Sequence, residues 1–203
     1  MSDPKGVPPE FFDRAYDGCP PWEIGRPQDD IVRLFDRDGF KGNVLDLGCG
    51  TGENALFLAS KKLHVLGVDR VSAAIDSARA KAKARKSKAT FEVGDALDLP
   101  ALGRKFDTVL DSGCFHVFSD ADRARYLASL AAVVPPRGTL HILCFSDEEP
   151  GTDGPRRVAE RELIGLFNMR GWLVEEVAEA RFETTLHPEG ARAWLATFVR
   201  YGE

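Results

Sequence analysis

The sequence lacks the features of a membrane-spanning or exported protein. No stretch approaches the roughly 18 consecutive apolar residues that a membrane-spanning helix requires. The first residues, MSDPKGVPPEFF, contain no charged segment followed by an apolar one, which a signal peptide would have. The four cysteines form no C-x-x-C pair, which argues against a disulfide framework. These absences predict a cytoplasmic protein with reduced thiols and no membrane partner.

An excess of positive charge is also absent. The chain has 27 basic and 32 acidic side chains and a net charge of −5, so it has no broad positive field to attract a phosphate backbone. One basic run, at residues 79–88, lies on an alanine-rich helical pattern, where such side chains commonly form a solvated face. We therefore expect no nucleic-acid partner.

What the sequence does contain is an alternation of strands and helices in a chain of 203 residues, the length of one ordinary domain. The expected strands are residues 43–47, 64–68, 90–93, 107–110 and 139–145. The helical patterns between them are residues 53–61, 72–86 and 120–133. This alternation predicts a Rossmann-like, doubly wound α/β fold with a mostly parallel sheet covered by helices on both faces.

The two ends of the chain depart from this alternation. A helical pattern at 158–168 is followed by strand-like runs at 172–177 and 194–201, with an expected loop between them that contains residues 187–190. Two runs without a long intervening helix predict an antiparallel hairpin at one edge, and therefore a seven-stranded sheet with an antiparallel C-terminal strand. Residues 1–40 are expected to form an N-terminal helical cap, with helices at 9–16 and 28–36.

A glycine-rich turn follows the first expected strand, within VLDLGCGTGEN at residues 44–54. Gly48, Gly50 and Gly52 stand where the chain must turn sharply and let a ligand approach its backbone. The spacing G-x-G-x-G is close to the dinucleotide fingerprint G-x-G-x-x-G, so the turn alone admits two kinds of cofactor. A tight turn without a ligand is the third interpretation.

Two aspartates at the ends of the next strands narrow this choice. Asp69 ends the second strand, where a carboxylate can accept two hydrogen bonds from the vicinal hydroxyls of a ribose. Asp95 follows the third strand, where it could accept from the exocyclic amine of adenine, with Ala96 and Leu97 beside the ring. A helix cap is the alternative for both aspartates.

In this order and spacing, the segments VLDLGCGTGEN, VLGVDR, FEVGDALDLP and FDTVLDSG resemble the class I S-adenosylmethionine-dependent methyltransferases. The resemblance covers about residues 40–146 and implies that S-adenosyl-L-methionine is the cofactor. It also implies that Asp46 holds the amino-acid end of this cofactor, Asp69 the ribose and Asp95 the adenine. The expected cofactor-binding residues are Trp22, Asp46, Gly48, Cys49, Gly50, Gly52, Asp69, Arg70, Asp95, Ala96 and Asp111.

A narrower resemblance lies upstream, in PWEIGRPQ at residues 21–28. This segment is similar to the N-terminal stretch that closes over the cofactor in methyltransferases of the thiol, halide and thiopurine group and in related bacterial quinone or quinolone enzymes. It implies that residues 1–40 form a lid over a catalytic core at 41–203, within a single domain. Trp22 would then face the sulfonium or the substrate. A tryptophan that only anchors the cap is the alternative.

The acceptor is expected beside the loops after the fourth and fifth strands, because ligands of a doubly wound sheet lie outside the carboxyl ends of its strands. His116 is the candidate general base, since imidazole titrates near neutrality, although it could equally shape the pocket. Asp111 is a second candidate catalytic residue and could orient the methionine portion or a water. Arg26 and Arg156 could hold an acidic acceptor. The expected acceptor contacts are Trp22, Arg26, Phe115, His116 and Phe145.

No metal site is expected. We interpret Cys49, Cys114 and Cys144 as small apolar filling at three strand ends. Asp111 with the acidic residues at 147–148 lacks the Asp-Asn pair of catechol-type enzymes, and no Asn-Pro-Pro-Tyr motif of amine methylation follows the fourth strand. The sequence therefore predicts methyl transfer to the oxygen, sulfur or nitrogen of a small, apolar or aromatic molecule. A nicotinamide-dependent oxidoreductase and a noncatalytic cofactor-binding protein are the alternatives.

Overall fold

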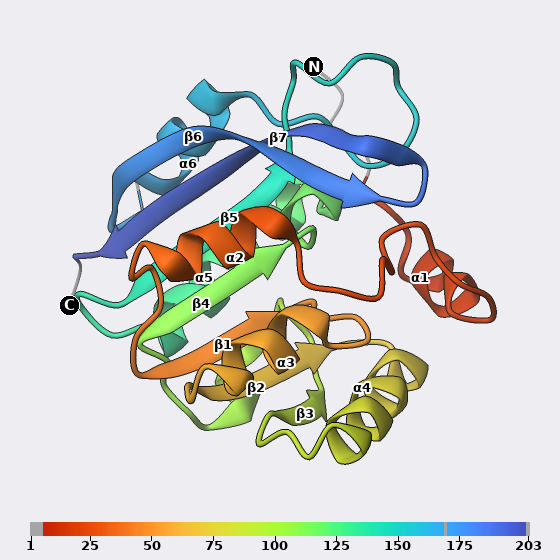
Figure 1. The fold of residues 1–203 in the computed structure, drawn as a ribbon. Helices are drawn as coiled ribbons and strands as arrows, with labels where there is room; N and C mark the ends of the chain where they lie inside the picture. The colour runs from red at the N-terminus through yellow and green to blue at the C-terminus, as the bar shows by residue number, and fades with distance from the viewer. Residues whose placement is uncertain (1–5, 169, 202–203) are drawn as a thin grey trace.

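The computed structural model describes residues 6–168 and 170–201, so the first five residues of the expected cap lie outside the described part. Its seven strands form one sheet in the order β3-β2-β1-β4-β5-β7-β6 (Figure 1). Strands β1 to β5 pair in parallel, and β7 runs antiparallel to both of its neighbours. The strands are β1 (Asn43–Leu47), β2 (His64–Asp69), β3 (Thr90–Val93), β4 (Thr108–Ser112), β5 (Thr139–Phe145), β6 (Trp172–Thr184) and β7 (His187–Arg200).

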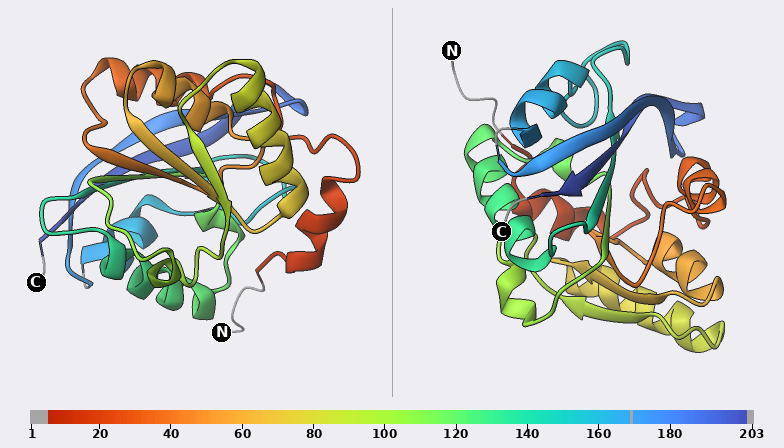
Figure 2. Two further views of the ribbon diagram at one scale, coloured as in Figure 1. Left: turned by 90° about the horizontal axis from the view of Figure 1, so that it is seen from below. Right: turned by 90° about the vertical axis from the view of Figure 1, so that its left-hand side faces the viewer.

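Helices cover both faces of this sheet (Figure 2). One layer consists of α2 (Asp29–Asp36), α3 (Glu53–Ser60) and α4 (Ser72–Ala84). The opposite layer consists of the 3-10 helix η1 (Leu99–Leu102), α5 (Asp120–Val133) and α6 (Glu160–Asn168). Alternate residues of β1 serve the two layers, because successive side chains of a strand point to opposite faces: Val44 packs with the α2 to α4 layer and Leu45 with the α5 layer. The expected fold class is confirmed.

The strand order places the site. The chain leaves β1 for β2 on one side and returns for β4 on the other, and doubly wound sheets bind ligands outside the carboxyl ends of the strands at such a switch point, which is called the crevice below. The short helices α1 (Pro9–Ala15) and η2 (Phe115–Val117) lie at this edge (Figure 1). Within the described residues, no helix is long and apolar enough to cross a membrane.

The prediction of a loop between residues 177 and 194 is wrong, because most of this segment belongs to two strands. Strands β6 and β7 have 13 and 14 residues and meet in a tight turn at Thr185 and Leu186. Gly190 resembled a loop signal, but it lies in β7 with a φ of 72°, near a register shift between Phe182 and Thr184. A bulge of this kind uses glycine inside a strand. The long hairpin consequently reaches past the carboxyl end of β5 (Figure 1).

Candidate active site

The glycine turn is built in a way that only glycine allows. Gly48, Gly50 and Gly52 have φ values of 68°, 52° and 86°, all in the left-handed region. The N–H groups of Gly48 and Cys49 both donate to the carbonyl of Val68, at 2.8 and 3.0 Å, and tie the turn to the end of β2. A Cβ added to Gly48 would lie 2.8 Å from the Cβ of Cys114. The missing side chains thus allow neighbouring groups to lie directly against the backbone of the turn.

Asp69 lies directly beside this turn. Its two carboxylate oxygens accept from the N–H groups of Gly50 and Val71, each at 2.9 Å. Burial is the main reason that the pKa of Asp69 is raised, and these two hydrogen bonds oppose the shift. Each oxygen keeps a second lone pair, so the carboxylate can still accept from a ligand hydroxyl. The Arg70 side chain is exposed beyond it.

The region expected to contact adenine is more open. Asp95 is exposed, two residues beyond the end of β3, and its Oδ1 accepts from the N–H of Leu97 at 2.8 Å. Ala96 and Leu97 are partly buried against the core on the α5 side. A carboxylate next to an apolar surface is compatible with an adenine edge and face, and the Asx-type hydrogen bond fixes the direction of the carboxylate.

Asp46 is the buried charge of the crevice. It is 1% exposed, and its Oδ2 has no hydrogen-bond partner among the described residues. Burial, with the neighbouring Asp111 and Asp69, raises the pKa of Asp46 to about 7, against the effect of the Ala55 N–H. An unpaired buried acceptor costs free energy unless a ligand donates to it. The ammonium group of an amino acid is such a donor, so Asp46 fits the amino-acid end of the expected cofactor.

The lid contacts the glycine turn through Glu23, which the sequence did not single out. The Oε1 of Glu23 accepts from the Thr51 N–H at 3.0 Å and from the Tyr16 hydroxyl at 3.2 Å, and its Oε2 accepts from the Thr51 hydroxyl. The indole N–H of Trp22 donates to the Tyr16 oxygen at 3.0 Å. Burial, with the nearby Asp69 and Glu23, raises the pKa of Tyr16. The only indication of this role in the sequence was that Glu23 is the acidic residue of the PWEIGR segment.

Arg26 is placed differently from the expectation. Its guanidinium binds Glu183 of β6 at 2.5 Å and Asp29 at 2.7 Å, and its side chain is half exposed. Gln28 exchanges two hydrogen bonds with the backbone of Glu183, at 2.9 and 2.8 Å. Arg26 therefore holds the lid against the β6–β7 hairpin and does not face an acceptor. Arg156 is likewise committed, to Asp120 and Glu162.

Asp111 organises the loop that follows β4. Its Oδ1 accepts from the N–H groups of Cys114 and Phe115 at 2.9 and 3.0 Å, and its Oδ2 accepts from the Tyr126 hydroxyl at 2.6 Å. Burial raises the pKa of Asp111 to about 6, against these three hydrogen bonds. The carboxylate thus fixes the loop that carries His116, and its side chain is fully buried.

His116 lies in the loop that follows β4, and the lone pair of its Nδ1 atom already accepts a hydrogen bond. The Nδ1 atom accepts from the Phe145 N–H at 3.0 Å, which places the proton on Nε2, and the ring is 4% exposed. Burial is the main reason that the pKa of His116 is lowered to about 3, and the positive Arg123 and Arg157 add to this shift. A general base needs a free lone pair. This geometry supports a neutral, structural imidazole.

The substitution His116→Asn tests the assignment, because the Asn carboxamide oxygen can replace Nδ1 as acceptor for Phe145. We expect kcat/KM to stay within about tenfold of the wild-type value and the pH profile to keep its shape, since removal of a true base costs about 10²- to 10⁴-fold. The measurement is kcat/KM against pH for both proteins. A hundredfold loss together with a missing acid limb would restore the base assignment.

Three buried aromatic rings pack against one another near the carboxyl ends of β4 and β5. The ring centroids of His116, Phe145 and Phe182 lie 5.4 to 5.6 Å from one another. Phe115, which was expected here, instead packs against Tyr126 and Phe167 in the core on the α5 side and is fully buried. Phe182 takes the place expected for Phe115. The sequence did not indicate this position for Phe182, because residues 178–193 were expected to form a loop.

Two of the cysteines, Cys49 and Cys114, lie at the glycine turn and are partly buried. Burial raises the pKa of Cys49 and of Cys114, and the nearby aspartates add to the shift. Cys144 is fully buried in β5. In the part of the chain that the structure describes, no group of three or more His, Cys, Asp or Glu side chains is arranged to hold a metal ion.

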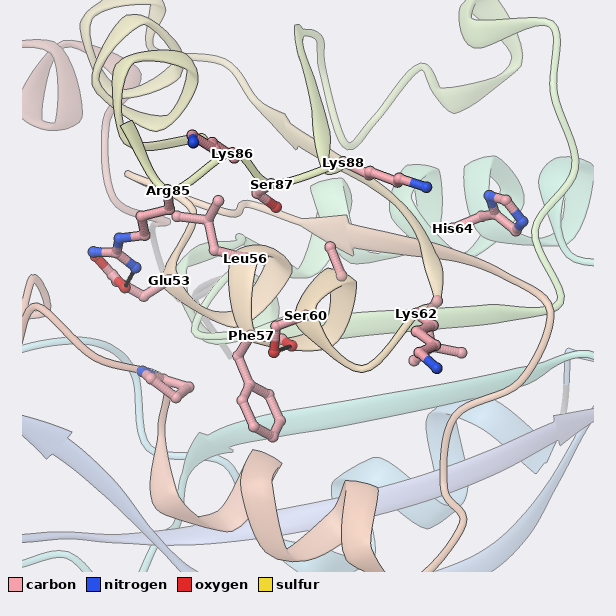
Figure 3. A pocket seen from close by; sticks show the side chains of 13 residues that line it. Glu53, Leu56, Phe57, Ser60, Lys62, His64, Arg85, Lys86, Ser87 and Lys88 are labelled. Atoms are coloured by element: carbon pink, nitrogen blue, oxygen red, sulfur yellow. Dashed lines mark hydrogen bonds and ion pairs between the residues drawn. The ribbon is translucent and has the colours of Figure 1, made fainter. Parts of the chain in front are cut away.

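A separate open hollow of about 700 Å³ runs along α3 and the loop after α4 (Figure 3). Its floor is apolar, and Lys62, Lys86 and Lys88 stand at its rim. At one end Arg85 binds Glu53 through two hydrogen bonds of 2.7 and 2.9 Å. The residues that line this hollow include none of the expected cofactor ligands. A smaller hollow of about 330 Å³ lies between the lid and α4 and is lined by both Glu23 and Thr51.

Comparison with known proteins identifies the family. Residues 44–138 match the family model described as a methyltransferase domain. A 2-heptyl-1-hydroxyquinolin-4(1H)-one methyltransferase of Mycobacteroides abscessus is 33% identical over 183 residues, which cover 85% of this chain and 80% of that protein. The chain belongs to the S-adenosylmethionine-dependent methyltransferases. Its cofactor is S-adenosylmethionine, as expected.

Other similar proteins are also methyltransferases or share the fold. A probable thiol methyltransferase of Arabidopsis thaliana is 26% identical over 71% of this methyltransferase and 65% of its own length. A solved structure described as "Conversion of a Disulfide Bond into a Thioacetal Group during Echinomycin Biosynthesis" has a TM-score of 0.86 and 35% identity, and the match covers 95% of this chain and 92% of that one. The oxidoreductase and noncatalytic alternatives are thereby set aside.

Proposed function

We propose that this methyltransferase transfers a methyl group to the oxygen, sulfur or nitrogen of a small, apolar or aromatic acceptor. The observation that carries the proposal is the aromatic group of His116, Phe145 and Phe182 at the carboxyl ends of β4 and β5, next to the cofactor crevice. The lid and the β6–β7 hairpin are joined over this edge, which favours an enclosed small molecule over a macromolecule. Two relatives named for a hydroxyquinolone and for thiols agree with such an acceptor.

In this proposal the cofactor lies across the glycine turn. Asp69 accepts from its ribose hydroxyls, Asp95 from its adenine amine, and Asp46 from its ammonium group, while Glu23 holds the lid over Thr51. When bound, the cofactor supplies an electrophilic methyl group on a sulfonium. The positive charge of that ligand matches the three carboxylates at Asp46, Asp69 and Asp111. Burial raises the pKa of each of them, and Asp111 and Asp69 add to the shift of Asp46.

The protein's contribution to the reaction is alignment and exclusion of water. The acceptor atom must lie in line with the methyl group at about 3 Å, and such positioning supplies most of the rate enhancement of a displacement. The Nδ1 lone pair of His116 is already used, and Asp111 is fully buried with both oxygens hydrogen-bonded to the protein. We therefore expect the preferred acceptors to ionise readily in water, as thiols, acidic phenols and N-hydroxy groups do. Their proton then leaves before the acceptor is enclosed.

A screen of thiols, phenols, hydroxyquinolines and halides with methyl-labelled cofactor tests the proposal. We expect turnover of at least one aromatic thiol or hydroxyl compound, and none with the Gly50→Ala variant as control. Binding of the cofactor without transfer to any acceptor class would contradict the acceptor assignment alone. Transfer to protein or nucleic acid, with small molecules inert, would contradict the small-molecule assignment.

A further inference from the structure

We infer that Phe182 determines which acceptors fit, by forming the wall of the acceptor site that faces the ends of β4 and β5. The inference rests on the proposed function, because it assigns a residue to that same acceptor site. Phe182 is remote in sequence from the cofactor segments and comes from the β6–β7 hairpin, which reaches past the carboxyl end of β5 (Figure 1).

The contacts of Phe182 place its ring at the expected acceptor position. The ring centroid lies 5.6 Å from that of His116 and 5.4 Å from that of Phe145. A Cβ added to Gly113 would come within 2.8 Å of its Cζ, so the tip of the ring lies against the loop that follows β4. Gly113 also has a φ of 91°, a backbone conformation that favours glycine at this position. The ring is 5% exposed and thus fills space at the ends of β4 and β5.

The lid fixes the backbone on both sides of Phe182. The N–H of Arg181 donates to Asp30 at 2.7 Å. On the other side, Glu183 exchanges hydrogen bonds with Gln28 and accepts two more, at 2.5 and 3.0 Å, from the guanidinium of Arg26. The segment that covers the cofactor therefore also sets the position of the acceptor wall. A ring held between two anchored residues has little freedom to move aside for a wider acceptor.

These contacts predict the class of acceptor that the site selects. The edge-to-face arrangement of Phe145 and Phe182 favours a flat aromatic ring inserted beside them. Shortening residue 182 would open a space of about one aromatic ring at the wall. A fused two-ring acceptor should gain more from that space than a one-ring acceptor with the same nucleophile.

The test compares matched acceptors in Phe182→Ala, Phe182→Leu and Phe182→Trp. The pairs are thiophenol with naphthalene-2-thiol, and 4-nitrophenol with 4-nitro-1-naphthol. We expect the ratio of kcat/KM for the two-ring over the one-ring acceptor to rise about tenfold in Phe182→Ala, to rise less in Phe182→Leu, and to fall in Phe182→Trp. Affinity for S-adenosylhomocysteine should stay within about twofold of wild type. Leu173→Ala, on the exposed face of the same strand, is the matched control and should leave the ratio unchanged.

Each outcome decides the inference. A change in both acceptors by the same factor would show that Phe182 only stabilises the hairpin, and the inference would fall. If Phe182→Ala does not fold, the opposite shifts expected for the leucine and tryptophan variants still provide the test. If the wild-type protein binds S-adenosylhomocysteine but methylates neither pair, the proposed acceptor class fails and takes this inference with it. If it does not bind that ligand at all, the cofactor site itself is misassigned.

Discussion

Replacing Gly50 with alanine is expected to lower the affinity for S-adenosylhomocysteine by at least about 100-fold, which corresponds to about 2.7 kcal/mol. Gly50 has a φ of 52°, and a Cβ at this position would lie 2.6 Å from the Oε1 of Glu23 and 2.8 Å from the hydroxyl of Tyr16. The variant must therefore push the carboxylate of Glu23 and the hydroxyl of Tyr16 away from the turn, which breaks the hydrogen bonds of Glu23 to Thr51, or distort the turn itself. Either change removes the surface on which the cofactor is expected to lie.

Gly103→Ala provides the matched control. Gly103 has a φ of 61°, but a Cβ added there has no atom within 4 Å. This variant carries the same kind of backbone strain, with a stability cost of about 1 kcal/mol, and no collision. Calorimetric titration should show normal binding for Gly103→Ala and none for Gly50→Ala. Equal loss in both, or in neither, would show that the turn and lid do not form the cofactor site.

The affinity for the cofactor should also depend on pH through Asp46. The carboxyl has a pKa of about 7 in the folded protein against an ordinary 3.8, because it is buried. Below its pKa the neutral carboxyl cannot pair with an ammonium group. Affinity should therefore fall about tenfold for each pH unit below about 7. Titrations of S-adenosylhomocysteine between about pH 5.5 and 7.5 measure this slope.

The same shift predicts the opposite trend for the stability of the ligand-free protein. A carboxyl with a raised pKa binds more protons when folded than when unfolded, so its contribution to stability is complete below about pH 4 and is lost as the pH rises through about 7. Asp46→Asn should thus bind the ligand weakly and without this pH slope, yet unfold at a higher temperature than wild type at neutral pH. A variant that loses stability, or that keeps the slope, would contradict the role given to Asp46.

The residues expected to bind the cofactor could be grouped from the sequence because their signals are local. Gly48, Gly50 and Gly52 each need a left-handed backbone at a fixed distance after a strand, and Asp69 and Asp95 lie at or just beyond the ends of the next two. A parallel sheet brings consecutive carboxyl ends to one edge, so sequence order is enough to bring these groups together. The same reasoning gave the strand pattern and the reversed last strand.

The acceptor side depends on contacts between distant segments. Phe115 and His116 are neighbours in sequence, but the 3-10 turn of η2 directs Phe115 into the core under α5. Phe182 lies beside His116 in its place and comes from the β6–β7 hairpin. The strand pattern of this hairpin is weak, because the end beyond β5 faces the lid on one side and solvent on the other. Arg26 forms an ion pair with Glu183, which lies 157 residues further along the chain. Composition and periodicity contain no information on such pairs.

Calorimetric titration of the wild-type protein with S-adenosylhomocysteine, beside a parallel titration with NAD, tests whether the glycine turn and its aspartates bind an adenosyl sulfonium cofactor. We expect one S-adenosylhomocysteine to bind to each chain and NAD not to bind. Absence of heat with S-adenosylhomocysteine, or tighter binding of NAD, would contradict this expectation.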